Sequence, residues 1–200
     1  IHIPAVLVTN SAAEFQFKNL SSVTTDDTAA AAAAVGYLAD MGHKKLAVIG
    51  GEREYSDTGR LRYAGVLRAL TERGMTFDAD RYYKTAHYSF DEGYEAMTEL
   101  LRDAPEITAV FAMADVMAIG AARAIRDAGK RIPEDISLIG FDGLPICRYY
   151  EPRLSTVTQQ IAFMAEKSYA VLLDMIENGS GAQHVLAPYT LEKTDSIRKN

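Results

Sequence analysis

The sequence predicts an α/β fold with a doubly wound parallel sheet. Short apolar runs alternate along the chain with longer segments in which apolar residues recur every three to four positions. Most of the short runs end in glycine or a polar residue, as strands do where they enter a loop. Strands that alternate with helices form parallel βαβ units, and the stretch from residue 26 to residue 142 holds four of them. That is enough for one compact domain.

The expected strands share a short run of β-forming residues with turn residues beside it. They cover residues 5–8, 45–49, 82–86, 107–112 and 136–141, and the tail adds two short candidates at 185–187 and 190–192. The expected helices share an apolar stripe at helical spacing. They cover residues 26–41, 58–73, 115–128 and 160–176, and one more begins after Ser89.

Capping residues set the expected beginnings of the helices. Asp26 or Asp27 is interpreted as the cap of the first helix, because a side-chain oxygen there accepts from a free backbone N–H group. Ser89 and Glu92 have the spacing of a capping box. Asp115 follows a strand, and we interpret it as the N-cap of the next helix in preference to a ligand group.

Composition and charge exclude several classes of protein. The net charge is −6 and there is no basic stripe or helix-turn-helix, so we expect the chain alone not to bind nucleic acid. The single cysteine, Cys147, allows no disulfide within one chain, which is typical of a reducing compartment. No apolar run approaches the roughly 18 residues of a membrane span. No signal peptide is visible, so we expect a cytoplasmic location and no membrane contact.

The sequence predicts no catalytic, metal or cofactor chemistry. The four histidines lack metal-ligand spacing, and the Gly50-Gly51 turn lacks the lysine of a phosphate loop. There is no G-x-S-x-G motif, and Cys147 has no convincing base partner. We therefore expect neither an enzyme nor a metal or cofactor site.

Asp142 is the best single candidate for a binding residue. It ends the apolar run 136–141 and is followed by Gly143, as at the carboxyl end of a buried parallel strand. Ligands of open α/β sheets bind just outside those ends. A carboxylate there can accept hydrogen bonds from two hydroxyls or from a ring nitrogen. The alternative is a helix cap or a turn acid.

Arg62 is the second candidate. Arg60 and Arg62 lie in the first turns of the expected helix 58–73, where positive charge is unfavourable to the helix dipole. A guanidinium offers a fork of donors that matches vicinal hydroxyls or a carboxylate. The alternative is a surface arginine paired with an acid.

Four further residues are weaker candidates. Tyr88 follows the strand 82–86, and its flat ring could stack on a sugar or base, although Phe90 competes for that role. Asn10 and Ser11 end the first strand. Gln159 follows the segment STVT, where it is either a polar ligand group or an amide that bridges backbone groups.

Five segments resemble the effector-binding core of the LacI/GalR family of bacterial transcription regulators. In order they are VTTDDTAAAAAAVGYLADMGHKKLAVIGG, TGRLRYAGVLRALTERGM, FAMADVMAIGAARAIRDAGK, IPEDISLIGFDG and EPRLSTVTQQ. The resemblance covers nearly the whole chain. It implies a periplasmic-binding-protein-like fold with two subdomains, between which the chain crosses three times. Residues 1–22 and 159–183 would form part of the N-terminal subdomain, and residues 23–158 and 184–200 the C-terminal subdomain.

The resemblance also implies site residues and partners. It places Arg62, an aromatic residue at Tyr88, and Asp142 on a small effector, a sugar or nucleoside held between the lobes. To these we add Gln159, Asn10 and Ser11 from their positions in the chain, as weaker candidates. Ala114 stands where many members have an asparagine that touches the ligand, which puts a particular sugar specificity in doubt. The tail also departs from the family, with Thr194-Asp195-Ser196 in place of the usual Arg-x-Ser.

The expected function is therefore that of the effector-binding and dimerisation region of such a regulator. Operator DNA would be bound through a headpiece absent from this chain, which we interpret as a fragment. A homodimer is expected, with Tyr94, Met97 and Leu101 as candidates for its surface. One alternative is a solute-binding protein of a sugar transport system. Another is an α/β enzyme with its active site at Asp142.

Overall fold

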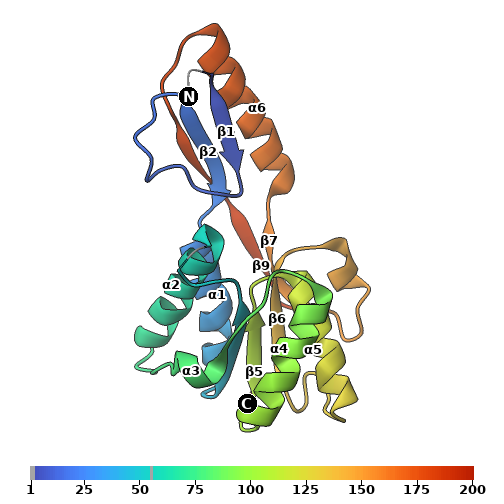
Figure 1. The fold of residues 1–200 in the computed structure, drawn as a ribbon. Coiled ribbons are helices and arrows are strands. Elements are labelled where there is room, and N and C mark those ends of the chain that lie inside the picture. The colour runs from blue at the N-terminus through green and yellow to red at the C-terminus, as the bar shows by residue number, and fades with distance from the viewer. Residues whose placement is uncertain (1–2, 55) are drawn as a thin grey trace. The chain divides into compact units, whose positions relative to one another are not determined.

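The structure is a computed structural model that describes residues 3–54 and 56–200, and the chain forms two compact units (Figure 1). The smaller unit comprises residues 1–27 and 159–189, and the larger comprises residues 28–158 and 190–200. The subdomain boundaries expected from the sequence therefore differ by a few residues. The reason is that β2 (Leu20–Thr25) pairs in parallel with β8 (His184–Ala187), so both whole strands lie in the smaller unit.

A six-stranded sheet forms the centre of the larger unit. Its order is β4-β3-β5-β6-β7-β9, and the pairs from β4 to β7 are parallel, which confirms the predicted α/β fold. The strands are β3 (Leu46–Gly50), β4 (Tyr83–Thr85), β5 (Ala109–Ala112), β6 (Ser137–Asp142), β7 (Ser155–Gln159) and β9 (Tyr189–Glu192). All of them were expected within a few residues except β7, which was not predicted as a strand from the sequence. β3, β5 and β6 are buried almost throughout, as expected for the centre of a sheet covered on both faces.

Two pairs of helices, α1 with α2 and α4 with α5, cover opposite faces of this sheet (Figure 1). Right-handed crossovers place α2, between β3 and β4, on one face and α4 and α5, which lead back to β5 and β6, on the other. The helices are α1 (Asp27–Asp40), α2 (Asp57–Thr71), the short α3 (Ala79–Tyr82), α4 (Phe90–Asp103), α5 (Asp115–Asp127) and a 3-10 turn, η1 (Pro145–Arg148).

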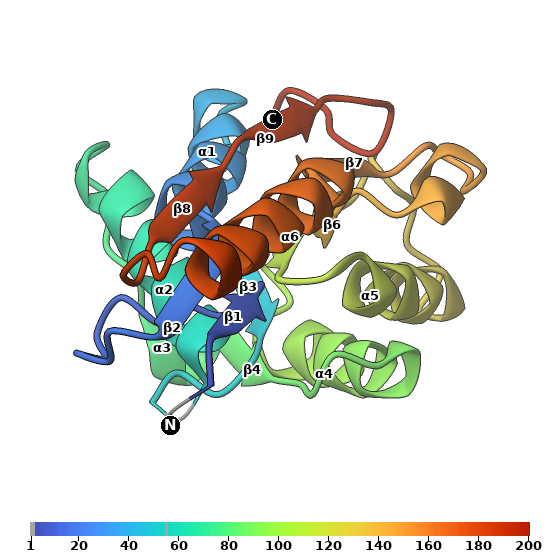
Figure 2. The same cartoon turned by 90° about the horizontal axis from the view of Figure 1, so that it is seen from above.

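α4 and α5 lie side by side at two glycines (Figure 2). A Cβ atom on Gly93 would lie 2.4 Å from the Met117 carbonyl oxygen, and one on Gly120 would lie 2.0 Å from the Phe90 carbonyl oxygen. Neither position has room for a side chain. The contact fixes the beginning of α4, and with it the loop that carries Tyr88.

The smaller unit is a three-stranded parallel sheet, β1-β2-β8, with β1 at Ala5–Val8. The long helix α6 (Ile161–Glu177) packs on β1 and β2, and Val23, Met164 and Ala187 form its core. Among the described residues, no helix is long and apolar enough to cross a membrane.

Candidate functional site

The carboxyl ends of the parallel strands gather the strongest candidates along one edge of the larger sheet. β3 ends at Gly50, β5 at Ala112 and β6 at Asp142, and Tyr88 follows the end of β4. Parallel strands all end at the same edge, so these positions are neighbours in the order of the sheet. This is the edge at which open α/β sheets bind ligands.

Arg62 on α2 is held firmly at this edge. Only 5% of the residue is exposed, and its guanidinium carbon lies 3.6 Å from the centre of the Phe141 ring. One guanidinium N–H group donates to the Met113 carbonyl oxygen, just beyond the end of β5. The description of a surface arginine fits Arg60 instead, whose guanidinium is 2.7 Å from Asp57 and partly exposed. Arg62 is therefore fixed between the ends of β5 and β6, on the residue that precedes Asp142.

Asp142 is the last residue of β6 and has an unusual backbone. Its φ angle is 119°, a region that residues with a side chain rarely adopt, and Gly143 follows with φ 78°. A Cβ atom on Gly143 would lie 2.5 Å from the Thr158 hydroxyl oxygen. Backbone strain of this kind costs about 1–3 kcal/mol and is concentrated at functional sites.

Asp115 holds the loop that follows Asp142, and the prediction that it is an N-cap is wrong. The N-cap position is Ala114, which has no side-chain oxygen, and Asp115 is already the first helical residue. Its fully buried carboxylate turns away from the helix and accepts from the Thr156 hydroxyl at 2.6 Å and from the Leu144 backbone N–H at 2.7 Å. Burial raises the pKa of Asp115 to about 6, against the effect of these hydrogen bonds.

Tyr88 lies in a strained loop between β4 and α4. Its φ angle is 58°, and 38% of the residue is exposed. A Cβ atom on Gly51 would lie 2.6 Å from the Tyr88 hydroxyl oxygen, so the loops after β3 and β4 meet here. Phe90, the alternative aromatic residue, is 48% exposed at the start of α4, and the geometry does not choose between the two.

The expected capping box beside Tyr88 is only half formed. The Ser89 hydroxyl accepts from the Glu92 backbone N–H at 3.2 Å, as predicted. The Glu92 carboxylate, however, accepts from the His87 backbone N–H at 2.7 Å and contacts the His87 ring at 2.6 Å. The hydrogen bond to the Glu92 carboxylate raises the pKa of the His87 ring. The box is rearranged because the left-handed turn at Tyr88 brings His87 to the helix end.

The remaining candidates lie in the smaller unit. Asn10 and Ser11 follow the carboxyl end of β1, as expected, and the Ser11 hydroxyl oxygen accepts from the Ala13 backbone N–H at 3.2 Å. The Gln159 side-chain oxygen accepts from the Thr25 hydroxyl at 2.8 Å. That bond joins two side chains and not backbone groups, so it does not test the interpretation of Gln159 as an amide that bridges the backbone.

Sequence reasoning missed one feature of the edge. Arg53 lies over the rings of Tyr63 and Tyr83, with its guanidinium carbon 5.3 Å and 5.1 Å from their centres. The two rings meet edge to face, and the Tyr83 hydroxyl donates to the Gly51 carbonyl oxygen. Nothing in the spacing of these residues along the chain indicated the contact, because they come from a loop, a helix and a strand.

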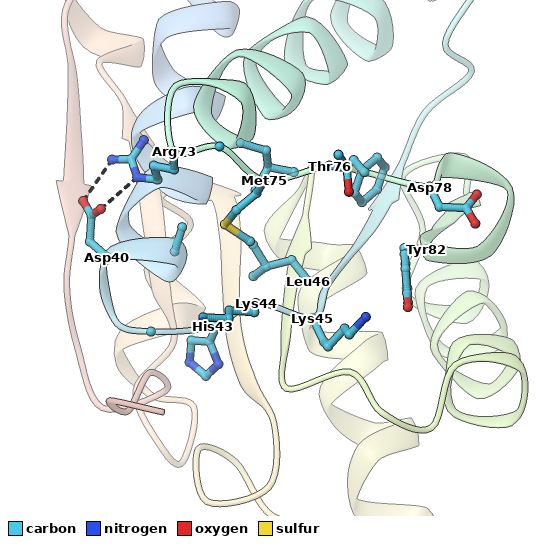
Figure 3. A pocket seen from close by; sticks show the side chains of 15 residues that line it. Asp40, His43, Lys44, Lys45, Leu46, Arg73, Met75, Thr76, Asp78 and Tyr82 are labelled. Atoms are coloured by element: carbon cyan, nitrogen blue, oxygen red, sulfur yellow. Dashed lines mark hydrogen bonds and ion pairs between the residues drawn. The ribbon is translucent and has the colours of Figure 1, made fainter.

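A sizeable cavity lies elsewhere in the larger unit. It has a volume of about 760 Å³ and opens at the amino ends of the strands, between the end of α1, the start of β3 and the loop after α2 (Figure 3). None of the candidate residues lines it. It is treated separately below.

The fold, with its parallel sheet and the candidate residues at one edge of it, is that of a periplasmic-binding-protein-like domain. Residues 35–197 match the family model of that description. The chain belongs to the LacI/GalR family of transcriptional regulators, as the resemblance of its motifs predicted, and it corresponds to the effector-binding core.

The similar proteins are regulators. The chain is 35% identical to the HTH-type transcriptional regulator MalR of Clostridium butyricum over 199 residues, which are 98% of this chain and 58% of that protein. A solved complex of the transcriptional regulator CelR with cellobiose superposes with a TM-score of 0.89 at 29% identity, over 96% of this chain and 58% of that one. A LacI-family regulator from Enterococcus faecium with bound ribose gives a TM-score of 0.87 at 30% identity, over 98% and 72%.

These relatives favour a regulator over the alternative of a transport solute-binding protein, and none of them is named as an enzyme. The chain spans about half the length of the curated relatives it matches. Within the described residues, no group of three or more histidine, cysteine or acidic side chains could hold a metal ion.

Proposed function

We propose that this chain binds a small polyhydroxylated effector, a sugar or nucleoside, at the carboxyl edge of the six-stranded sheet and does not turn it over. The observation that carries the proposal is the Arg62 guanidinium, buried on the Phe141 ring beside the strained Asp142. A fixed guanidinium fork and a carboxylate together can donate to and accept from neighbouring hydroxyls. Tyr88, partly exposed at the same edge, supplies a ring that can stack on the apolar face of a sugar.

The bound sugars of two solved relatives support a polyol ligand. One holds cellobiose and the other ribose. Ala114 cannot make the polar contact that an asparagine would make, so we expect this chain to differ from some relatives in its choice of sugar. Asn10, Ser11 and Gln159 are proposed as secondary contacts from the smaller unit.

Calorimetric titration of a sugar and nucleoside panel tests this site, and Arg60 offers a matched control. Arg62→Lys keeps the charge but removes the fork of donors and the planar contact with Phe141. We therefore expect the affinity for the effector to fall at least tenfold. Arg60→Lys changes the same residue type two positions away, in an exposed pair with Asp57, and should change affinity less than twofold. If the two substitutions lower the affinity equally, or if neither changes it, the proposal that the effector binds at this edge of the sheet is contradicted. Chemical change of the bound sugar would contradict the absence of turnover.

The whole protein is proposed to act as a cytoplasmic regulator that contacts operator DNA through helix-turn-helix residues outside this sequence. The relatives named HTH-type regulators support that proposal, as does the net charge of −6 of this chain. Specific affinities of such regulators lie around 10⁻⁸ to 10⁻¹¹ M at physiological salt. A gel shift with this chain alone should show no complex in that range. A specific shift would place DNA contacts within residues 1–200.

A homodimer is the proposed assembly, with one change to the expected surface. Met97 is fully buried in the core of its own unit, so it cannot contribute to an interface. Tyr94 on α4 is 36% exposed, and Tyr149, after η1, is 87% exposed. Tyr149 replaces Met97 in the proposal, and Tyr94 and Leu101 stay in it. Sedimentation should give a dimer for the full-length protein at micromolar concentration. A monomer with and without effector would contradict it.

A further inference from the structure

The cavity at the amino edge of the six-stranded sheet has the size and lining of a ligand site. Its volume of about 760 Å³ lies within the usual range of about 300–1,000 Å³ for small-molecule pockets. Leu46, Leu70, Met75 and Phe77 give it an apolar lining. Figure 3 shows the Met75 side chain extending into the space between the wall with Asp40 and the start of β3.

The charges around this cavity favour an anion. Lys44, Lys45 and Arg73 line it together with two carboxylates, Asp40 and Asp78. The lining thus carries net positive charge, whereas the chain carries −6. Burial lowers the pKa of His43, the remaining titratable lining group apart from Tyr82, so its ring is neutral near pH 7.

Both carboxylates of the lining already have partners. Asp40 accepts two hydrogen bonds from the Arg73 guanidinium, at 2.8 and 2.9 Å, as the dashed lines in Figure 3 mark. Asp78 accepts from the Asp80 backbone N–H at 3.2 Å, as the cap of α3. A cationic ligand would therefore compete with existing bonds.

Unlike the two carboxylates, the two lysines of the lining, Lys44 and Lys45, have no ion-pair partner among the described residues. The Lys45 ammonium nitrogen lies 5.9 Å from the centre of the Tyr82 ring and points across the cavity toward it (Figure 3). An anionic group at the Lys45 ammonium group would gain a charge-assisted contact without breaking an ion pair, and Lys44 adds a second positive charge to the same lining.

We propose that this cavity is a second small-molecule site, for an organic anion with an apolar body: a carboxylate or phosphate attached to an aromatic or aliphatic group. The anionic head lies at Lys44 and Lys45, and the body lies on Met75, Phe77 and the Tyr82 ring. The site is independent of the effector edge, because β3 starts at this cavity with Leu46 and runs to Gly50 at the other edge.

Methyl NMR of the methionines in the full chain tests the site directly. Met75 lies in the cavity, and Met113 lies at the effector edge, where its carbonyl accepts from Arg62. Phenyl phosphate and 3-phenylpropionate are the two anionic probes, and Met75→Leu assigns the resonance. We expect both probes to shift the Met75 signal with a Kd of about 1 mM or tighter and to leave Met113 unmoved.

Three further probes separate the parts of the proposal. Inorganic phosphate carries the head alone, benzyl alcohol the body alone, and benzylamine the opposite charge, and each should bind at least about threefold more weakly. Lys45→Gln should weaken both anions by about three- to tenfold, whereas Lys167→Gln, an exposed lysine on α6, should have no effect. No shift of Met75 at millimolar probe, equal binding of benzylamine, or equal effects of the two lysine substitutions would overturn the proposal.

Discussion

The Thr156 hydroxyl donates a hydrogen bond to the buried Asp115 carboxylate at 2.6 Å, and this bond joins β7 to the first turn of α5. The same carboxylate accepts from the Leu144 backbone N–H, two residues after Asp142. One buried acid therefore fixes the loop beside the proposed effector edge. The cost is a desolvated charge, which raises the pKa of Asp115 to about 6 from 3.8.

Asp115→Asn should change the pH dependence of stability. A carboxyl group whose pKa is raised by folding binds more protons in the native state, so its contribution to the free energy of unfolding falls as pH rises from about 4 to about 6. A shift from 3.8 to about 6 corresponds to about 3 kcal/mol at most. Asparagine is nearly isosteric and does not titrate.

Denaturant unfolding of both proteins at pH 4 and pH 7 measures this effect. The stability of the wild type relative to Asp115→Asn should fall by up to about 3 kcal/mol between the two pH values. Subtracting the free energy of unfolding of the variant from that of the wild type at each pH removes the contribution of the acidic groups that both proteins share. If the two stability profiles run parallel, Asp115 titrates normally in the native state.

Asp142→Gly should separate the two roles of that residue. Glycine adopts φ 119° without strain, and we expect the fold to be as stable as the wild type or more stable by up to about 1 kcal/mol. Loss of the carboxylate should cost about 1.5–3 kcal/mol of effector binding. Asp142→Ala keeps the strain and should lose the same binding energy with stability nearly unchanged. Thermal unfolding and calorimetric titration compare the pair, and retained affinity in both variants would move the effector elsewhere.

The sequence predicted the order of strands and helices better than the contacts between them. It missed β2, because the segment LSSVTT has only two apolar residues although all six are buried. Its hydroxyls are satisfied by distant partners: Ser21 accepts from the Gln183 backbone N–H at 3.0 Å, and Thr25 donates to Gln159 at 2.8 Å. Such partners lie more than 130 residues away along the chain, where local periodicity carries no information.

The candidate site shows the same limit. Positions at strand ends follow from the alternation of strands and helices, so Asp142 and Tyr88 could be placed at one edge from the sequence. The direction in which a side chain turns does not follow from it. Asp115 has the position of a cap, and only its partner Thr156, 41 residues later, shows that the carboxylate turns inward.

Gly120→Ala should destabilise the larger unit by about 1–3 kcal/mol, the usual cost of forcing extra atoms into a packed contact. The added methyl group would lie 2.0 Å from the Phe90 carbonyl oxygen, which is backbone and cannot rotate away. Gly181→Ala is the control, because no atom lies within 4 Å of its Cβ position. Urea unfolding of both variants measures the difference. A Gly120→Ala protein as stable as the control would mean that α4 and α5 are farther apart than described.

Cys147 should resist thiol reagents in the folded protein. It is 3% exposed, and burial together with the neighbouring Asp115 carboxylate raises the pKa of its thiol well above the usual range. Only the thiolate reacts, so labelling of the native protein at pH 8 should be at least about a hundredfold slower than in the unfolded chain. Because Cys147 is the single cysteine, the total label incorporated reports this site alone. Asp115→Asn removes the adjacent negative charge and one anchor of the loop that carries Cys147, so its labelling should be faster than in the wild type. Native labelling as fast as that of the unfolded chain would show that this loop opens readily, and the anchoring role assigned to Asp115 would then be wrong.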